Sequence, residues 1–267
     1  MITEAWLAAL RRELSCRGVP ADVIEQALLA ADTTTRPERT SVRVGAQTSS
    51  GTDRIRDLDT PDSRRLRLEV RGVSKRYGRR LVLQNVTVSV YAGEVLAIIG
   101  ANGAGKSTLL RICAGLTRPS RGSVFIDGTV GYCPQDGGIL DFLTADDHFT
   151  LFGVGRGLDR RTARRIGRSL ASALSWEANG TAQARHLSGG TRQKLDVSLS
   201  MIGDPDILLL DEPYQGFDKG AYFDFWETIW KLRDAGKSVV VVTHMLNTLD
   251  HADAILDLTP TSAAVAR

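Results

Sequence analysis

Apolar runs of strand length recur along the chain and indicate its architecture. Three of them are almost wholly apolar, which is typical of parallel strands buried on both faces: residues 95–99, 207–210 and 238–242. Residues 66–70 and 83–90 instead alternate apolar and polar positions, as half-buried antiparallel strands do. The pattern predicts an α/β domain over residues 65–260, in which an antiparallel β layer precedes a parallel core sheet.

Shorter signals complete the expected order of elements. Further short strands are expected at residues 123–126, 130–133 and 254–258. Residues 144–184 are mostly helical in pattern, and residues 221–235 have the spacing of an amphipathic helix. The glycines between residues 153 and 157 interrupt the first of these helical regions, so we expect a helix end and a loop there.

The first 64 residues differ in character from the rest. Apolar positions such as Trp6, Leu10 and Leu14 recur every four residues, and they predict a helical extension of two short helices over residues 1–31. Residues 32–64 are rich in Thr, Ser, Arg, Asp and Gly and predict a flexible linker. Helices this short bury too little surface to stand alone, so they pack on the main domain, pack on another protein, or stay marginally stable.

Composition narrows the class of protein. No apolar run reaches the ~18–20 residues that span a bilayer, and charged residues such as Glu4 and Arg11 interrupt any signal-peptide core. Three cysteines without metal-ligand spacing argue against a disulfide framework. We therefore expect a cytoplasmic location. A net charge of +3 is too small to imply nucleic acid by itself.

One expected helix is unusually basic. Five arginines recur on it at three- and four-residue spacing: Arg160, Arg161, Arg164, Arg165 and Arg168. This pattern is typical of a solvated helix face, which is the interpretation we favour, and the alternative is a surface for anionic headgroups or for an acidic partner segment. The sequence leaves both interpretations open.

A glycine-rich loop lies between the apolar strand at residues 95–99 and a helical segment that begins near residue 106. Strand, glycine loop and helix in this order form a phosphate site, because backbone N–H groups and the helix N-terminus surround the anion. Lys106 would reach the β- and γ-phosphates, and Ser107 would offer a hydroxyl to Mg²⁺. The expected binding residues for a nucleoside triphosphate are Gly100, Asn102, Gly103, Gly105, Lys106, Ser107 and Thr108.

Two adjacent carboxylates follow the apolar strand at residues 207–210. In an open parallel sheet, ligands bind at the carboxyl ends of the strands. Asp211 is placed there to hold Mg²⁺, directly or through water, and Glu212 to polarise the attacking water. A polar strand end that caps the next helix would explain one carboxylate, but it explains a pair less well.

A third motif is a helix start at residues 187–195. Ser188 is the expected N-cap, and Gly189 and Gly190 expose backbone N–H groups at the positive end of the helix dipole. This is a second anion-binding geometry, and it lies outside the phosphate loop.

Taken together, these motifs resemble the nucleotide-binding subunits of ATP-binding-cassette (ABC) transporters, over roughly residues 66–258. The family signature Leu-Ser-Gly-Gly-Gln corresponds to residues 187–191, with Thr191 in place of Gln. The resemblance implies the P-loop NTPase cassette fold, with a helical subdomain inserted at about residues 137–187. It also implies ATP as the substrate, Mg²⁺ as the metal and ATP hydrolysis coupled to transport.

The resemblance further assigns roles to single residues. Tyr77 matches the aromatic residue that stacks on adenine, and Gln135 matches the glutamine that touches Mg²⁺ and signals to the membrane partner. His244 matches the histidine that contacts the γ-phosphate, and Asp218 matches the aspartate that couples the two sites of a dimer. The expected catalytic residues are Lys106, Gln135, Glu212 and His244, and the expected metal-binding residues are Ser107, Gln135 and Asp211.

The implied assembly is a head-to-tail homodimer. Each ATP would lie between the phosphate loop of one subunit and Ser188, Gly189 and Gly190 of the other. The dimer would sit on the inner face of the cell membrane and power a separate permease. The alternative is a soluble cassette ATPase that acts on nucleic acid or ribosomes. That class carries long coiled coils or two cassettes per chain, and neither is visible here, so we expect no direct contact with nucleic acid.

Three departures from the family pattern qualify the resemblance. Tyr214 and Phe217 are bulky residues in a loop that is usually Ser-Ala-Leu-Asp, so coupling between the two sites of the dimer is in question. Thr191, followed by Arg192 and Lys194, resembles the subgroup that exports lipids and hydrophobic drugs. The segment between the phosphate helix and residue 132 is also shorter than usual, without loss of a catalytic motif.

Overall fold

The computed structural model describes residues 11, 65–136, 138–178, 181–244 and 250–259. The expected helical extension and linker therefore lie outside the described residues, except for residue 11. Among the described residues, none of the helices combines the length and the apolar character needed to cross a bilayer.

Three strands form an antiparallel sheet of order β2-β1-β4. Its strands are β1 (Leu66–Tyr77), β2 (Arg80–Tyr91) and β4 (Arg121–Ile126). The first two are longer than the alternating runs predicted. Pairing continues through polar positions to the tip of the hairpin, where Tyr77 faces Arg80. The predicted antiparallel layer is confirmed, and the β1–β2 hairpin continues past the predicted alternating runs into an exposed tip.

Five strands form a parallel sheet of order β5-β6-β7-β3-β8. They are β5 (Val130–Cys133), β6 (Ile207–Asp211), β7 (Ser238–Val242), β3 (Val95–Ile99) and β8 (Ala254–Asp257). Every neighbouring pair runs parallel. The central strands are buried along nearly their whole length, which confirms the parallel core predicted from their uninterrupted apolar runs.

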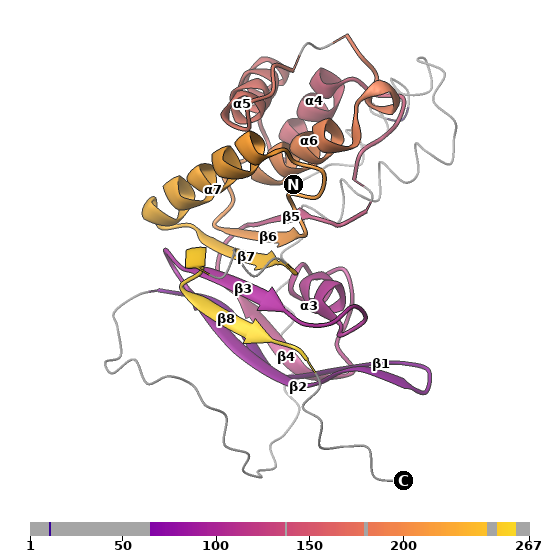
Figure 1. Ribbon diagram of the computed structural model, residues 1–267, viewed down its shortest axis with the longest axis vertical. Helices are drawn as coiled ribbons and strands as arrows, with labels where there is room; N and C mark the ends of the chain where they lie inside the picture. Colours follow the sequence, from indigo (N-terminus) through magenta and orange to yellow (C-terminus); the bar gives the residue numbers. More distant parts are fainter. Residues whose placement is uncertain (1–10, 12–64, 137, 179–180, 245–249, 260–267) are drawn as a thin grey trace.

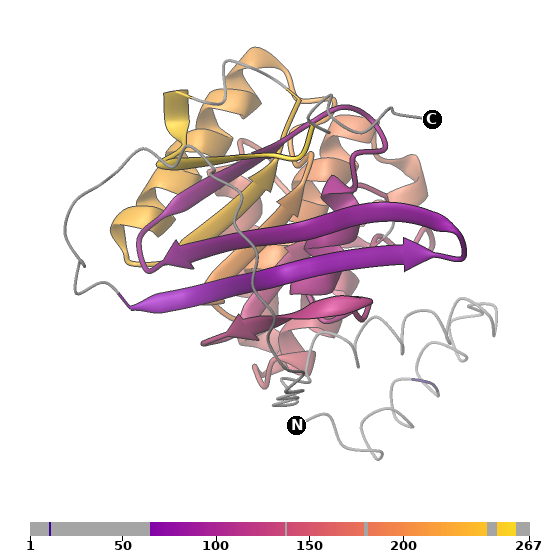
Figure 2. The same cartoon turned by 90° about the horizontal axis from the view of Figure 1, so that it is seen from below.

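Alternate residues of the parallel sheet face two separate cores. Leu96, Leu209 and Val240 face helix α3 (Lys106–Cys113), which lies between the two sheets. Leu208 and Val239 point the opposite way, toward two helices on the other face. These helices are α6 (Gly189–Met201) and α7 (Lys219–Asp234). Figure 2 shows the antiparallel sheet as the layer that covers α3 from outside.

An outer helical layer packs on α6. It consists of α4 (Ala145–Gly155) and α5 (Arg160–Ala173), and a short 3-10 helix (Ala184–His186) leads into α6. Two glycines let α4 and α5 approach closely. A Cβ on Gly153 would lie 2.4 Å from Cβ of Ala163, and one on Gly167 would lie 2.1 Å from the ring of Phe149. The glycines therefore serve helix packing, and α4 ends at Gly155 within the glycine-rich stretch.

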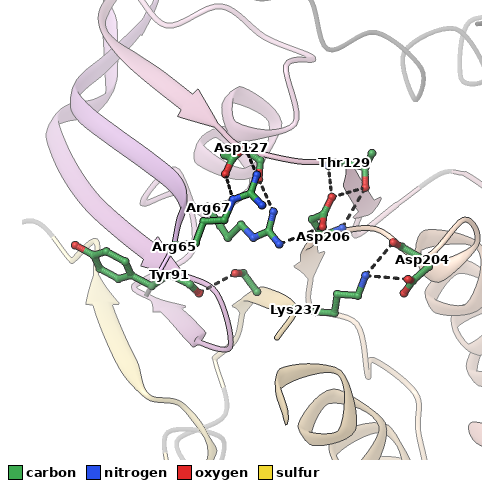
Figure 3. A network of polar contacts seen from close by, with 9 residues as sticks. Arg65, Arg67, Tyr91, Asp127, Thr129, Asp204, Asp206 and Lys237 are labelled. Atoms are coloured by element: carbon green, nitrogen blue, oxygen red, sulfur yellow. Dashed lines mark hydrogen bonds and ion pairs between the residues drawn. The ribbon is translucent and has the colours of Figure 1, made fainter. Parts of the chain in front are cut away.

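A polar network joins the two sheets at the amino end of β6 (Figure 3). The guanidinium of Arg67 lies 3.2 Å from the carboxylate of Asp206 and also donates to the carbonyl of Asp127. Arg65 forms a two-pronged ion pair with the Asp127 side chain. Asp206 in turn accepts hydrogen bonds from the backbone N–H and the hydroxyl of Thr129. This network, which spans β1, β6 and the turn between β4 and β5, fixes the sheets against each other.

Candidate functional site

The glycine-rich loop links the end of β3 to the start of α3. Gly103 and Gly105 have positive φ angles of 82° and 98°, a conformation that L side chains rarely adopt. A Cβ on Gly105 would also lie 2.6 Å from Cδ2 of Leu83 and 2.9 Å from the carbonyl oxygen of Val82. Glycine is therefore required at this turn both for its backbone conformation and for the close approach of β2.

Lys106 is the first residue of α3, and its side chain is 7% exposed. Its ammonium group donates hydrogen bonds to the carbonyl oxygens of Gly100 and Ala101, at 2.8 and 3.3 Å. The loop thus folds around the lysine. Asn102 and Gly103 are exposed, and Ser107 and Thr108 are half-buried in the first turn of the helix.

Asp211, at the carboxyl end of β6, is 1% exposed. One carboxylate oxygen, Oδ1, has no hydrogen-bond partner. Burial raises the pKa of Asp211 above its ordinary value, and the Glu212 charge adds to this, whereas a hydrogen bond with Ser107 and the charges of Arg111 and Lys106 oppose it. A buried carboxylate oxygen without a partner, beside a serine hydroxyl, is suited to a bound cation.

Glu212 is the point where three expected catalytic side chains meet. Its Oε2 accepts a hydrogen bond from Nε2 of Gln135 at 3.3 Å, and its Oε1 lies 3.4 Å from Nδ1 of His244. Glu212 has a φ angle of 50°, in the left-handed region that is uncommon for residues other than glycine. Its N–H donates to the carbonyl of Val242 on β7, which holds this strained backbone in place.

Tyr77 lies at the tip of the β1–β2 hairpin and is 50% exposed. The ammonium of Lys75 lies 4.8 Å from the centre of its ring. The hairpin packs its Leu83 side against the glycine loop, as the close approach to Gly105 shows. Tyr77 is therefore an exposed aromatic ring on the element that borders the phosphate loop.

The signature motif lies on the other face of the parallel sheet. Ser188 caps α6 by accepting a hydrogen bond from the N–H of Thr191 at 3.2 Å, and it is exposed. The following Gly189 is also exposed. Because α6 and α3 pack on opposite faces of the sheet, this motif does not share the cluster formed by the phosphate loop, Asp211 and Glu212 within one chain.

The signature helix is tightly packed against the loop that follows Glu212. A Cβ on Gly190 would lie 2.4 Å from the carbonyl oxygen of Gly216, so a larger residue at position 190 would displace that loop. Asp218, at the end of the loop, accepts a hydrogen bond from the N–H of Ala221 at 2.8 Å and caps α7. Asp218 therefore has a structural role as the N-cap of α7, and its coupling role between the two sites of a dimer stays a prediction.

A buried hydroxyl contact was not anticipated from the sequence. The hydroxyl of Tyr214 hydrogen-bonds to Oγ1 of Thr243, the residue before His244. Tyr214 is 5% exposed, and its ring packs edge-on against Phe225 at a centroid distance of 5.7 Å. The bulky side chain thus ties the loop after Glu212 to the segment that carries His244. The only sequence signal near this contact is the apolar strand that precedes Thr243, which indicates that Thr243 lies at the end of a buried strand.

A buried histidine fixes the loop that leads into α4. Nε2 of His148 accepts a hydrogen bond from the N–H of Leu140 at 2.9 Å, and Nδ1 contacts the carbonyl of Thr144 at 2.8 Å. This pairing requires the neutral ring with the proton on Nδ1. Burial lowers the pKa of His148 to about 4, against a smaller opposing effect of the hydrogen bond to Thr144. The ring therefore stays neutral at physiological pH and ties the backbone of Leu140 to that of Thr144, the N-cap of α4.

The fold and the site define a P-loop nucleotide-binding protein of cassette architecture. Residues 83–215 match the sequence profile of the ABC transporter family. An uncharacterized ABC transporter ATP-binding protein of Methanocaldococcus jannaschii is 31% identical over 193 residues, covering 72% of this chain and 74% of that protein. The chain belongs to the ATP-binding family of ABC transporters, which is a family of ATPases.

Other relatives support the same family. Nod factor export ATP-binding protein I of Ralstonia nicotianae is 35% identical over 191 residues, or 67% of this chain. The chain spans about 60% of the length of that protein. A bacterial ABC transporter cassette, solved as a dimer, matches with a TM-score of 0.66 at 25% identity, over 72% of this chain and 94% of the cassette.

Proposed function

We propose that this chain binds and hydrolyses ATP as the energy-supplying subunit of an ABC transporter. The observation that carries the proposal is the convergence of Gln135, Glu212 and His244 at the carboxyl end of β6, next to a glycine loop of phosphate-binding shape. Such an edge, with charged groups converging from several strands, is where ligands bind in α/β folds.

Each residue of this group has a distinct task in the proposed reaction. Backbone N–H groups of the loop and the N-terminus of α3 hold the phosphates. Lys106 leaves the carbonyls of Gly100 and Ala101 and compensates charge on the β- and γ-phosphates. Glu212 accepts a proton from the attacking water, and His244 contacts the γ-phosphate. Tyr77 stacks on adenine with its exposed ring.

Mg²⁺ fits the residues at this site. The Oδ1 of Asp211, which has no hydrogen-bond partner, and the neighbouring Ser107 hydroxyl supply hard oxygen ligands, and the side chain of Gln135 contacts Glu212, the next residue along the chain. When bound, the metal compensates charge on the phosphate oxygens. Ser107, Asp211 and Gln135 would hold it, with Asp211 contributing directly or through water.

We infer that the working unit is a head-to-tail homodimer. Ser188, Gly189 and Gly190 lie on the opposite face of the sheet from the phosphate loop of their own chain, so they suit the nucleotide of a second copy. The exposed N-terminus of α6 supplies the N–H donors and the positive dipole end for an anion there. A related bacterial cassette was solved as a dimer, which is consistent with this assembly.

The transport role involves a separate membrane permease at the cytoplasmic face of the cell membrane. Relatives named for Nod factor export, and a human phospholipid-transporting ATPase that is 33% identical over 194 residues, favour export over import. We therefore propose an exporter of a hydrophobic drug, a lipid or a peptide. The permease, rather than this chain, would select among these cargoes.

The experiment mixes two inactive variants of the full chain. Lys106→Ala should lose ATP binding, and Ser188→Arg should keep ATP binding as a monomer but lose hydrolysis, because the arginine blocks the partner's nucleotide. Their mixture should regain hydrolysis up to the level of one competent composite site per dimer. Two outcomes would contradict these proposals. A wild-type chain that neither binds nor hydrolyses Mg-ATP would overturn the proposed function. Loss of ATP binding in the Ser188→Arg monomer would overturn the dimer geometry alone. Control Ser172→Arg, exposed on α5, should behave as wild type.

A further inference from the structure

The hairpin that carries Tyr77 also presents an arginine to the phosphate loop. Tyr77 and Arg80 face each other as the last pair of the β1–β2 ladder, so their side chains leave the same face of the sheet. That face is the one directed at the glycine loop. A Cβ on Gly105 would lie 2.6 Å from Leu83 of the same strand, and one on Gly103 would lie 3.6 Å from Nη2 of Arg80.

Arg80 therefore lies between two parts of the nucleotide site. Tyr77 marks the place of the adenine in the proposed function, and Gly103 belongs to the loop that holds the phosphates. Arg80 is exposed, and no carboxylate among the described residues pairs with it. By contrast, the neighbouring Lys75 is engaged, because its ammonium donates to the carbonyl of Arg118 at 2.7 Å. An exposed guanidinium at this position, unpaired with any carboxylate of the described residues, would face the anionic part of a bound nucleotide.

Lys106 approaches the loop from within, where its ammonium contacts the loop carbonyls, whereas Arg80 approaches from the hairpin outside it. Two cations on opposite sides of a polyphosphate can act together, because the polyphosphate carries several negative charges. A planar guanidinium suits phosphate oxygens, since it donates two parallel hydrogen bonds.

We propose that Arg80 is a further nucleotide-binding residue, whose guanidinium contacts the phosphates from the hairpin side. This inference rests on the proposed ATP-binding function and adds a residue that none of the sequence motifs contains. Its contribution is partly screened, because the side chain is exposed, so its effect should be smaller than that of Lys106 and should depend on salt.

The test measures affinities of the full chain for ATP, ADP and adenosine by titration calorimetry, with Arg80→Gln and Arg79→Gln as a matched pair. Arg79 is an exposed turn residue next to Arg80, so both variants remove one positive charge from the hairpin tip. Arg80→Gln should weaken ATP binding by about 5- to 20-fold, and Arg79→Gln by less than about 2-fold. Adenosine binding should change by less than about 2-fold in either variant.

Salt and a charge-retaining variant sharpen the result. Raising KCl from about 50 to 300 mM should shrink the difference between wild type and Arg80→Gln, because the contact is ionic. The ATP affinity of Arg80→Lys should lie between those of wild type and Arg80→Gln, since lysine keeps the positive charge but cannot donate two parallel hydrogen bonds. Equal ATP affinity in the two glutamine variants, or an equal loss for adenosine, would overturn the role of Arg80. Wild-type chain without ATP affinity would overturn the proposed function and this inference with it.

Discussion

The two ends of strand β6 each carry an aspartate, and the two carboxylates have opposite surroundings. Asp206, before the strand, accepts hydrogen bonds from Thr129 at 2.9 and 3.0 Å and pairs with Arg67. Burial is the largest single effect on its pKa and would raise it, but Thr129, Arg67 and Lys237 together lower the pKa below its ordinary value. Asp211, at the other end, has a raised pKa and an oxygen without a partner.

This difference separates a structural carboxylate from a functional one. At the amino end (Figure 3), both carboxylate oxygens of Asp206 have partners within the protein, Thr129 for one and Arg67 for the other. At the carboxyl end, burial without full pairing costs free energy, which the fold tolerates where a ligand completes the site. Unmet bonding capacity, rather than burial or charge alone, distinguishes the two ends.

The largest effect is expected at the carboxyl end. Glu212→Gln should retain ATP binding and slow turnover by on the order of 10²–10⁴-fold, because the amide cannot accept the proton of the attacking water. The variant should also accumulate as a dimer in the presence of ATP, since hydrolysis no longer releases the closed state. Steady-state hydrolysis and size-exclusion chromatography with ATP measure both outcomes. Turnover near the wild-type rate would remove Glu212 from the mechanism.

The next effect concerns the metal. Asp211→Asn should raise the Mg²⁺ concentration needed for half-maximal hydrolysis by about 10- to 100-fold, as loss of a ligand-orienting carboxylate typically does. The same change should raise the melting temperature without Mg²⁺ at pH 7, because it removes a buried charge. The folded-state pKa is raised, so this stabilisation should fade as the pH falls toward the ordinary value near 4. A lower melting temperature at pH 7 would contradict the comparison.

The smallest effect is expected at the amino end. Asp206→Asn should lower the free energy of unfolding by about 1–2 kcal/mol at pH 7, since it weakens charge-assisted hydrogen bonds at a partly exposed site. Catalysis at temperatures where the variant is folded should match wild type. The folded-state pKa is lowered, so the stability that Asp206 contributes is present above its ordinary pKa and is lost as the pH falls through the folded pKa. Urea denaturation at pH 7 and below pH 4 tests this, and a deficit that persists in acid would count against it.

Much of the fold could be predicted from local patterns. Three of the five parallel strands, β3, β6 and β7, follow from almost wholly apolar runs, and the antiparallel layer follows from alternation, because each pattern reports how many faces of a strand are buried. The strands at residues 130–133 and 254–258 are expected from the sequence, but only the tertiary structure places them in the parallel sheet. The phosphate loop follows from glycine spacing between a strand and a helix, since its function depends on consecutive backbone N–H groups. The pair Asp211 and Glu212 follows from its place at the end of a buried strand.

Other features required the tertiary structure, because they join residues far apart in the sequence. The sequence assigns Gln135 and His244 to the site only through the family resemblance, whereas the tertiary structure brings their side chains to Glu212. Likewise, nothing local distinguishes Arg80 from Arg79, and only the packing of the hairpin on the loop does so.

The sequence by itself therefore determined the secondary elements, the phosphate loop and the class of chemistry, since each depends on neighbouring residues. It did not determine which of the two carboxylates finds hydrogen-bond and ion-pair partners within the protein. Asp206 and Asp211 lie at the two ends of the same apolar strand, and their pKa values shift in opposite directions. Burial dominates at Asp211 and raises its pKa, whereas contacts with Thr129, Arg67 and Lys237 outweigh burial at Asp206 and lower its pKa. Electrostatic environment is set by contacts across the fold, and only the tertiary structure decides those contacts.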